Sequence, residues 1–452
     1  MDGNQDNGIP HLALVLPEII QKIAAFLPTC DLLTCTRINS TWETAVRRKL
    51  LSISRITLDP EKIDLYTKHV TARGSCPTNI SFFPFDDPAT LLLPLWQNFI
   101  SEHGRKMESL QISLALGEVP TWLHYLSHLS KSFPNLTFLK LFLSPRDPRD
   151  DTVSKFPPNP NISFPKVNNL FIKVYHVPEG CPHLLSMLTQ LVPLLPNIRG
   201  LFLLERGQSV LEHLLNFAPT LTSVFMNSPK LPSPVKLNLA NLTRLEFAQC
   251  WARTSDLPKL LLITAGTLQH LKLYATENAD PSDPIHRFCI HSIHFPIMEK
   301  LKIFEIVQSQ VTNRNIYGNC LVSPAIRFKF QNSGERRLDY PVQFPVLETI
   351  RISKMELDPH FSNFGNNVLT KQEYFATSKA FLYNYFLHES NSKGLTVKKL
   401  DIPYPPCFNK GIGGERCLAF CDCIETGEIS EFWDRVIAIF PNLVRFHAMG
   451  AR

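Results

Sequence analysis

Apolar residues recur at relative positions one, four and six in a series of short segments that covers most of the chain. The clearest copy has Leu242, Leu245 and Phe247 at these positions, with Cys250 at position nine. Side chains alternate along a strand, so positions four and six share one face and position one supports the turn into it. The pattern predicts a series of short strands, each with one buried face. The copies read ESLQISLAL, FPNLTFLKLFLS, FPKVNNLFIKV, LPNIRGLFLLE, APTLTSVFMNS, LANLTRLEFAQC, AGTLQHLKLYA, FPIMEKLKIFE, FPVLETIRISK, LTVKKLDIPY and FPNLVRFHAMG.

A segment of helical periodicity precedes most of these strands, as in HLLSMLTQLVPLL, LPKLLLITA and EFWDRVIAIF, and a proline often ends it. Such units, at spacings of about 21 to 31 residues, are typical of leucine-rich repeats, whose stacked members share one core. The predicted fold class is α/β, an irregular leucine-rich-repeat solenoid with a curved parallel sheet on its concave side and helices on its convex side. An ordinary α/β sheet of βαβ units has the same periodicities and stays open as the alternative.

The spacing also predicts the domain organisation. A disordered tail is expected at 1–13, a helical unit at 14–51, a linker or first irregular repeat at 52–105 and the repeat domain at 106–452. Wide gaps between late copies predict insertions. Those at 276–294 and 306–343 are mixed polar and predicted to be loops; 355–394 contains KQEYFATSKAFLYNYFLH, a predicted helix, and 402–428 is the fourth.

Residues 14–51 follow a helical rather than a strand pattern. A first helix is expected around Ile19 to Leu27 and ends at Pro28, Asp31 is the predicted N-cap of a second, and a third starts near Thr41 with Trp42 on its inner face. Three helices this short bury little apolar surface, so a partner is expected to cover the excess.

This segment resembles the F-box motif in its LP opening, its Ile-rich first helix, its FLP stop and the spacing from Asp31 to Trp42. It departs from that motif in having one residue fewer after Pro17, and in INSTW where the family has a more basic run. An F-box-like segment followed by leucine-rich repeats is similar to the F-box/leucine-rich-repeat substrate receptors of SCF ubiquitin ligases.

The resemblance implies a non-catalytic protein whose F-box docks on a Skp adaptor, and so on a cullin scaffold, while the repeats hold the protein to be ubiquitinated. Packing inside the helical unit is the alternative role for each implied adaptor-facing residue, and the favoured one for Trp42. A leucine-rich-repeat scaffold with a helical cap and no ligase role is the alternative function. The implied adaptor-facing residues are Leu16, Pro17, Ile20, Ile23, Leu27, Leu32 and Leu33.

The residue between positions four and six of each strand points away from the core, into the concave face. The early members of this row are aromatic and several later ones are basic, a combination that suits a protein interface with an acidic or phosphorylated segment. Solvated sheet residues with no binding role are the alternative. The row comprises Lys140, Phe171, Phe202, Phe225, Glu246, Lys272, Lys302, Arg351, Asp401 and His447, with His270 and Lys300 beside it.

Composition adds little to this picture. The net charge of +6 is spread along the chain and predicts no nucleic-acid partner. Eleven cysteines and no signal peptide predict a cytoplasmic or nuclear protein. The apolar run HLALVLPEIIQKIAAFL is interrupted by Glu18 and Lys22, so no membrane span is expected.

No motif for catalysis or cofactor binding stands out. Phosphate-binding glycine motifs, nucleophile elbows and zinc-protease helices are missing from the sequence, so no enzyme and no cofactor are predicted. His286, His291 and His294 lie near Cys289 and are predicted to be loop residues. Four late cysteines lack Cys-x-x-Cys spacing and are predicted to be free thiols rather than a metal site. These are Cys407, Cys417, Cys421 and Cys423.

Overall fold

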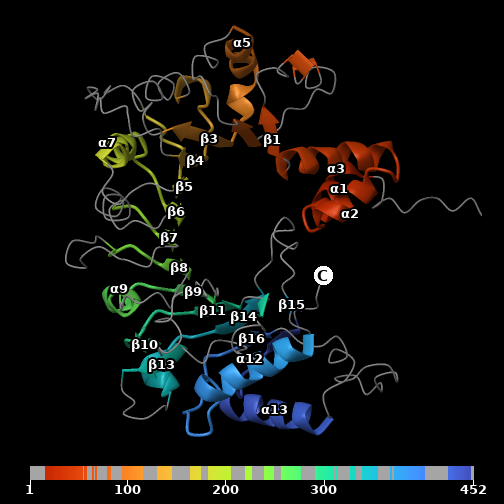
Figure 1. Ribbon diagram of the computed structural model, residues 1–452. Coiled ribbons are helices and arrows are strands. Elements are labelled where there is room, and N and C mark those ends of the chain that lie inside the picture. The colour runs from red at the N-terminus through yellow and green to blue at the C-terminus, as the bar shows by residue number, and fades with distance from the viewer. Residues whose placement is uncertain are drawn as a thin grey trace, which may run out of the picture. The chain divides into compact units, whose positions relative to one another are not determined.

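A computed structural model gives the structure of the protein. It describes residues 16–53, 55–58, 64–65, 67–68, 79–82, 94–115, 130–144, 163–174, 182–204, 219–226, 239–248, 256–275, 291–308, 311–312, 326–331, 338–354, 367–368, 371–402 and 426–448. The described residues form a mixed α/β fold without a closed barrel, in two compact units (Figure 1). The first unit reaches Ile198 and the second begins at Arg199.

The described part of the first unit has three N-terminal helices followed by a parallel sheet. Strands β1 to β5 pair in chain order, each parallel to the next. The bounds of its elements are α1 Pro17–Ala24, α2 Thr29–Cys35, α3 Ser40–Ile53, β1 Arg55–Leu58, β2 Asn79–Phe82, α5 Pro94–His103, β3 Ser109–Ala115, β4 Phe138–Ser144, β5 Asn169–Val174 and α7 Pro182–Leu191.

The described part of the second unit continues the same plan. Its main sheet has the order β6, β7, β8, β9, β11, β14, β16, β17, with every neighbouring pair parallel. The bounds are β6 Gly200–Leu204, β7 Ser223–Met226, β8 Arg244–Ala248, α9 Asp256–Thr264, β9 His270–Ala275, β10 His291–Phe295, β11 Ile303–Gln308, β12 Val311–Thr312, β13 Ile326–Phe330, α11 Tyr340–Gln343, β14 Thr349–Lys354, β15 Asn367–Val368, α12 Lys371–Tyr385, β16 Lys399–Ile402, α13 Thr426–Ile439 and β17 Arg445–Ala448.

The predicted strand series and several predicted helices are confirmed. In β8, Leu245 and Phe247 are buried as positions four and six, and Leu242 is buried as position one. Helices α7, α9 and α13 occupy the predicted helical segments, and α12 occupies the helix predicted within 355–394. In both units the strands of the predicted series pair in the order in which they follow along the chain.

Side chains of the lead-in residues connect successive copies. An asparagine just before the strand donates a hydrogen bond from its amide to a backbone carbonyl near the start of the preceding copy. Such bonds satisfy backbone carbonyls before the preceding strand, and they connect one copy to the next. The pairs are Asn135 to Arg105 (2.7 Å), Asn197 to Pro165 (2.8 Å), Asn241 to Pro219 (2.9 Å) and Asn442 to Leu395 (2.9 Å).

The prediction of loops at 276–294 and 306–343 is wrong in part. Strands β10 and β13 form a separate parallel pair, and β12 pairs antiparallel with β15. His291 and His294, predicted to be loop residues, therefore belong to β10, whereas His286 and Cys289 lie outside the described residues. Residues 52–105, predicted as a linker or irregular repeat, contain two sheet strands, β1 and β2, as well as α5.

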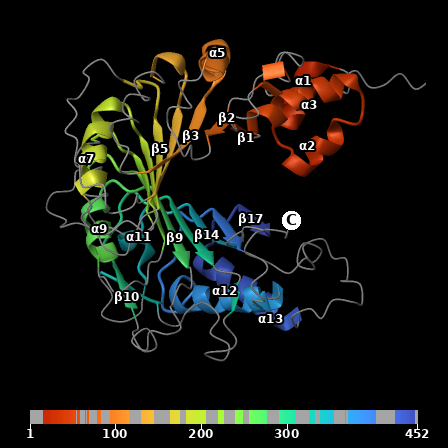
Figure 2. The ribbon, with the colours of Figure 1, turned by 45° about the horizontal axis from the view of Figure 1, so that its top comes forward.

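The pair β10 and β13 supports an aromatic core in the second unit. Phe295 packs against Phe304 of β11 and Phe328 of β13, with ring centroids 5.8 Å and 4.9 Å away, and Phe304 lies 5.2 Å from Phe386, just after α12. Helices α9 and α12 and strand β10 lie on one side of strands β9 and β14 in Figure 2. The opposite side of these strands carries the polar side chains considered below.

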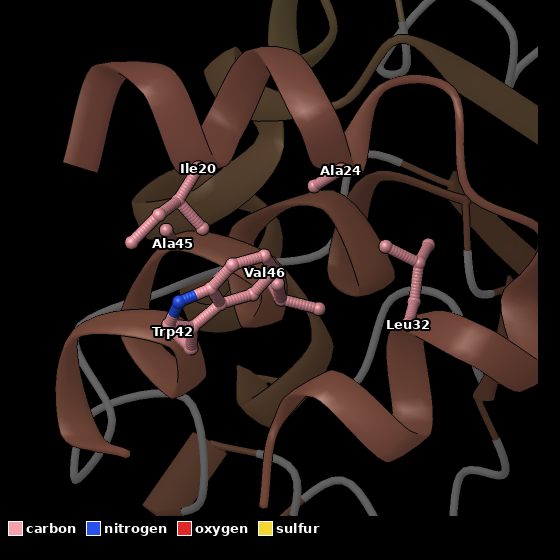
Figure 3. Close-up of a cluster of buried hydrophobic side chains, with 6 residues drawn as sticks. All are labelled: Ile20, Ala24, Leu32, Trp42, Ala45 and Val46. Carbon is pink, nitrogen blue, oxygen red and sulfur yellow. The ribbon is translucent and has the colours of Figure 1, made fainter. Parts of the chain in front are cut away.

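The N-terminal helices enclose a small core of their own. Trp42 of α3 packs with Ile20 and Ala24 of α1 and Leu32 of α2 (Figure 3). The Asn39 carboxamide accepts a hydrogen bond from the Trp42 backbone N–H at 2.9 Å and caps α3. The burial predicted for Trp42 is confirmed. The N-cap predicted at Asp31 is wrong, because α2 begins two residues earlier, at Thr29.

Gly104 gives a test of packing in the first unit. A Cβ atom at this position would lie 2.3 Å from the backbone carbonyl oxygen of Ser132, so one of the two segments would have to move. We expect Gly104→Ala to lower the free energy of unfolding by about 1–3 kcal/mol. Gly266→Ala is the control, because a Cβ atom there meets nothing within 4 Å. Urea unfolding of both variants checks the prediction, and equal stabilities would contradict it.

Candidate functional site

The strand register of the second unit brings one row of side chains together on the face opposite the aromatic core. These residues are direct neighbours on adjacent parallel strands, so their Cα atoms are about 4.8 Å apart. The row is aromatic at β6 and β7 and alternates in charge from β8 to β16. In strand order it comprises Phe202, Phe225, Glu246, Lys272, Glu305, Arg351, Asp401 and His447.

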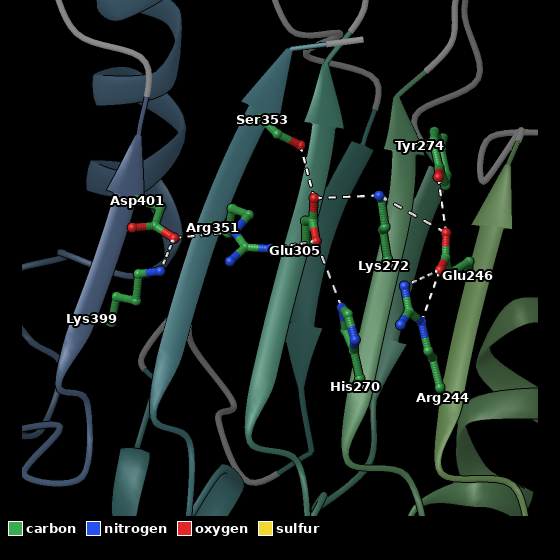
Figure 4. A network of polar contacts seen from close by, with 10 residues as sticks. All are labelled: Arg244, Glu246, His270, Lys272, Tyr274, Glu305, Arg351, Ser353, Lys399 and Asp401. Carbon is green, nitrogen blue, oxygen red and sulfur yellow. Dashed lines mark hydrogen bonds and ion pairs between the residues drawn. The ribbon is translucent and has the colours of Figure 1, made fainter. Parts of the chain in front are cut away.

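Glu305 is the centre of the charged part (Figure 4). Its side chain is 6% exposed, its Oε1 accepts a hydrogen bond from Ser353 Oγ at 2.9 Å, and its Oε2 lies 3.3 Å from Arg351 Nη1. Lys272 Nζ is 3.5 Å from Oε1 and His270 Nε2 is 3.6 Å from Oε2. Burial alone would raise the pKa of Glu305, but the polar groups of His270, Lys272, Ser353 and Arg351 outweigh it and lower the pKa to about 2.

Glu246 is a second buried carboxylate, on the β6 side of Glu305. The Arg244 guanidinium donates to Glu246 Oε1 from Nε at 2.9 Å and from Nη2 at 2.6 Å. The Tyr274 hydroxyl donates to Oε2 at 2.9 Å. Burial, together with the charge and the hydrogen bond of Glu246, raises the pKa of Tyr274. Tyr274 is thus held neutral as a hydrogen-bond donor.

Asp401 is the third buried carboxylate, on the β17 side. Its Oδ2 receives Lys399 Nζ at 2.9 Å and Arg351 Nε at 3.1 Å. Arg351 therefore bridges Glu305 and Asp401, as Lys272 bridges Glu246 and Glu305. Buried carboxylates without such partners would carry a large desolvation cost, so the alternation is a condition for the row to fold.

These contacts correct the view of the row as a basic cluster. Lys272 and Arg351 occupy the predicted face, but each lies between two buried acids that its charge compensates. Their side chains are 20% and 29% exposed, whereas the acids beneath them are almost fully buried. The buried acids therefore compensate the partly exposed charges of Lys272 and Arg351.

Lys302 and Lys300 do not belong to the row. Both are exposed and lie before β11, which begins at Ile303, and the strand register places Glu305 next to Lys272. The placement predicted for Lys302 is wrong because Leu301 and Ile303 imitate the alternation of a strand, whereas the buried pair of β11 is Phe304 and Ile306.

The aromatic members of the row lie as predicted, in two separate sets. In the first unit, Phe171 neighbours Lys140 in register, and its ring lies 5.5 Å from Phe142. In the second unit, Phe202 and Phe225 stack at 6.2 Å, and Phe225 meets Tyr274 edge to face at 5.5 Å. Tyr274 was missed from the sequence because it lies two positions beyond Lys272 on β9, outside the repeat position considered.

The N-terminal helices present a second candidate surface, made of exposed apolar side chains. Leu16, Ile19 and Ile23 recur at the spacing of one helix face; Leu16 and Ile23 are exposed and Ile19 is half-buried. Phe26 is 86% exposed, more than any other large apolar residue described. Among the described residues, five of the exposed large hydrophobics fall within this helical unit, and we call them the helical apolar surface: Leu16, Ile23, Phe26, Leu33 and Ile38.

The residues predicted from the sequence to face the adaptor differ in their exposure. Leu16, Pro17, Ile23 and Leu33 are exposed, as a partner contact requires. Ile20 and Leu32 are fully buried in the core of the helical unit, so the expectation that they face a partner is wrong. Leu27 is half-buried and packs against that core. Phe26 and Ile38 were missed, although the apolar residue in the FLP stop was a usable signal for Phe26.

The described residues hold no other evident chemistry. They contain no group of three or more His, Cys, Asp or Glu side chains that could ligate a metal ion. Cys407, Cys417, Cys421 and Cys423 lie outside them. None of the helices in the described ranges is both long enough and apolar enough to cross a bilayer.

The lowered pKa of Glu305 gives a pH prediction. A carboxylate whose folded pKa lies below its unfolded value of 4.5 contributes stability that is complete above 4.5 and lost as the pH falls towards 2. We expect the stability difference between the unmodified protein and Glu305→Gln to shrink by about 1–2 kcal/mol from pH 6 to pH 3, with screening allowed for. Urea unfolding of both proteins at the two pH values measures it; a difference that is constant with pH would contradict the assignment.

No protein-family model matches this chain, and a comparison with curated proteins finds no match.

Proposed function

We propose that the protein is a substrate receptor of an SCF-type ubiquitin ligase, in which residues 14–51 are a divergent F-box and the strand series is a leucine-rich-repeat solenoid. The helical unit docks on a Skp adaptor and, through it, on a cullin scaffold. The strand faces hold the target protein, with no catalytic step performed by this chain.

The observation that carries the proposal is the helical apolar surface. A unit whose own core is formed by Ile20, Ala24, Leu32 and Trp42 leaves Ile23, Phe26 and Leu33 exposed. Exposed apolar side chains at helical spacing favour a partner groove over solvent, and this is a known mode of peptide recognition. The resemblance to the F-box motif indicates that this partner is a Skp adaptor.

The solenoid part of the proposal is supported by the repeat contacts. Strands that pair in chain order, buried positions one, four and six, and asparagine bonds between successive copies agree with a stacked array. The scaffold alternative, in which the helices only cap the array, would require the apolar side of α1 to be covered. The exposure of Ile23 and Phe26 favours docking over capping.

Co-expression tests the proposal directly. The full chain is produced with a Skp adaptor and with the adaptor plus a cullin, and each mixture is resolved by size-exclusion chromatography. We expect one species that contains all partners. Separate elution of the chain and the adaptor would overturn the ligase role and leave the scaffold alternative.

A further inference from the structure

The face of the second unit carries an aromatic surface that directly adjoins one lysine. Phe202, Phe225 and Tyr274 form a continuous run of ring contacts, and Lys272 Nζ lies 5.1 Å from the Tyr274 ring centroid. We call these four residues the aromatic–lysine platform. All four residues are partly exposed, and the Lys272 side chain is 20% exposed.

Lys272 lies farther from its carboxylate partners than Lys399, the other lysine of the network, lies from its own. Lys399 Nζ lies 2.9 Å from Asp401, a normal charge-assisted hydrogen bond. Lys272 Nζ lies 3.5 Å from Glu305 and 3.9 Å from Glu246, both beyond normal hydrogen-bond length. Lys272 is therefore compensated in charge by two acids while its N–H groups keep the capacity to donate to a further anion.

The charge balance of the network limits which anion fits. Four cations, Arg244, Lys272, Arg351 and Lys399, face three buried carboxylates, Glu246, Glu305 and Asp401, which leaves one positive charge. A single carboxylate neutralises this excess. A phosphate group, at about −1.5 to −2, would exceed it and would lie close to two buried acids.

The geometry of the sheet sets the spacing of the recognised groups. Phe225 is on β7 and Lys272 on β9, two strands away, a distance of about 10 Å. A chain in the extended polyproline II conformation advances about 3.1 Å per residue and returns every third side chain to the same face, so two residues three positions apart span roughly this distance and both face the sheet.

We propose that the aromatic–lysine platform binds a segment of a partner protein in the extended polyproline II conformation, in which a large apolar residue and a single Asp or Glu are three positions apart. The apolar side chain packs on Phe202 and Phe225, and the carboxylate accepts hydrogen bonds from Lys272. This inference rests on the proposed function and deepens it, because it names the chemistry of the target segment that the receptor selects.

Short fluorescein-labelled peptides test the inference by fluorescence polarisation on the full chain in complex with its adaptor. The parent peptides place Phe and Glu three positions apart in a Gly/Ser background, in both sequence orders. We expect one order to bind and its Glu→Gln version to bind about fivefold more weakly. A peptide with Phe→Ala, and one with the two residues five positions apart, are expected to lose binding in the same way.

Two protein variants provide the matched comparison. Lys272→Met is expected to weaken binding of the parent peptide about fivefold. It should also abolish the preference for the Glu peptide over the Gln peptide. Lys302→Met removes an exposed lysine that lies before β11 and is expected to change neither. The peptide series on the unmodified protein does not depend on whether Lys272→Met folds.

The outcomes separate this inference from the proposed function. Equal binding of the Glu and Gln peptides, or no binding by an intact adaptor complex, overturns the platform assignment and leaves the ligase role standing. Tighter binding of a phosphoserine peptide than of the Glu peptide overturns the choice of a single carboxylate. Peptide binding by a chain that fails to join the adaptor supports the platform and refutes the ligase role.

Discussion

Replacing Glu305 with Gln is expected to lower the free energy of unfolding of the second unit by about 3 kcal/mol. Removal of one partner from a buried ion pair costs about 3–5 kcal/mol, and partial exposure of Lys272 and Arg351 places this case at the lower end. The amide cannot compensate either cation, and each would keep only one acid, Glu246 or Asp401. Urea unfolding, with hydrogen exchange of β9, β11 and β14 to locate the effect, measures the change.

Two comparisons show whether loss of the ion pairs causes the lower stability of Glu305→Gln. Glu299→Gln removes an exposed carboxylate from the turn before β11 and should change stability by less than about 0.5 kcal/mol. In a double-mutant cycle with Arg351→Met, the two substitutions should couple by about 1 kcal/mol or more, because the residues share a contact at 3.3 Å. Additive effects, or equal effects of Glu299→Gln and Glu305→Gln, would refute the ion-pair explanation.

The network also explains how much of this face was visible in the sequence. Repeat position alone placed Phe202, Phe225, Lys272 and Arg351 correctly, because that position depends only on the alternation of a strand. The compensation of Lys272 and Arg351 was not predictable in this way. Each basic residue meets its acids across strands, and Arg351 lies 46 and 50 residues from Glu305 and Asp401.

The second unit shows why insertions are the hardest part of such a chain to interpret. Strands β10 and β13 pair with each other outside the main sheet, and their sequences, HSIHF and IRFKF, lack the lead-in that marks the repeat. Their contribution is visible only in the core, where Phe295 and Phe328 pack on Phe304. A local pattern cannot identify a strand whose partner is another insertion.

The helical unit shows a different limit of prediction from the sequence. Its motif predicted three helices and a buried Trp42, which the structure confirms. The motif gave no means of separating Ile20, which is buried, from Ile23, which is exposed, since both are isoleucines of one helix. That separation depends on which side of α1 meets α3, and it decides which substitutions test docking without damage to the fold.

The double substitution Ile23→Asp and Leu33→Asp is therefore expected to abolish adaptor binding, with a loss of affinity of at least about 100-fold. Each residue is an exposed apolar anchor on α1 or α2, and truncation of a central anchor in a protein interface typically costs about 2 kcal/mol or more. A charge at these positions adds the cost of desolvating a carboxylate in an apolar groove. Pull-down and surface plasmon resonance with a purified Skp adaptor measure the loss.

The fold of the helical unit should survive this change, because neither side chain contributes to the core around Trp42. Val444→Asp is the matched control: Val444 is 83% exposed and lies in the second unit, so its substitution should leave adaptor affinity unchanged. Retained binding by the double variant would refute the assignment of the docking surface. Loss of binding by Val444→Asp as well would show that apolar exposure in general, rather than the helical apolar surface, holds the adaptor.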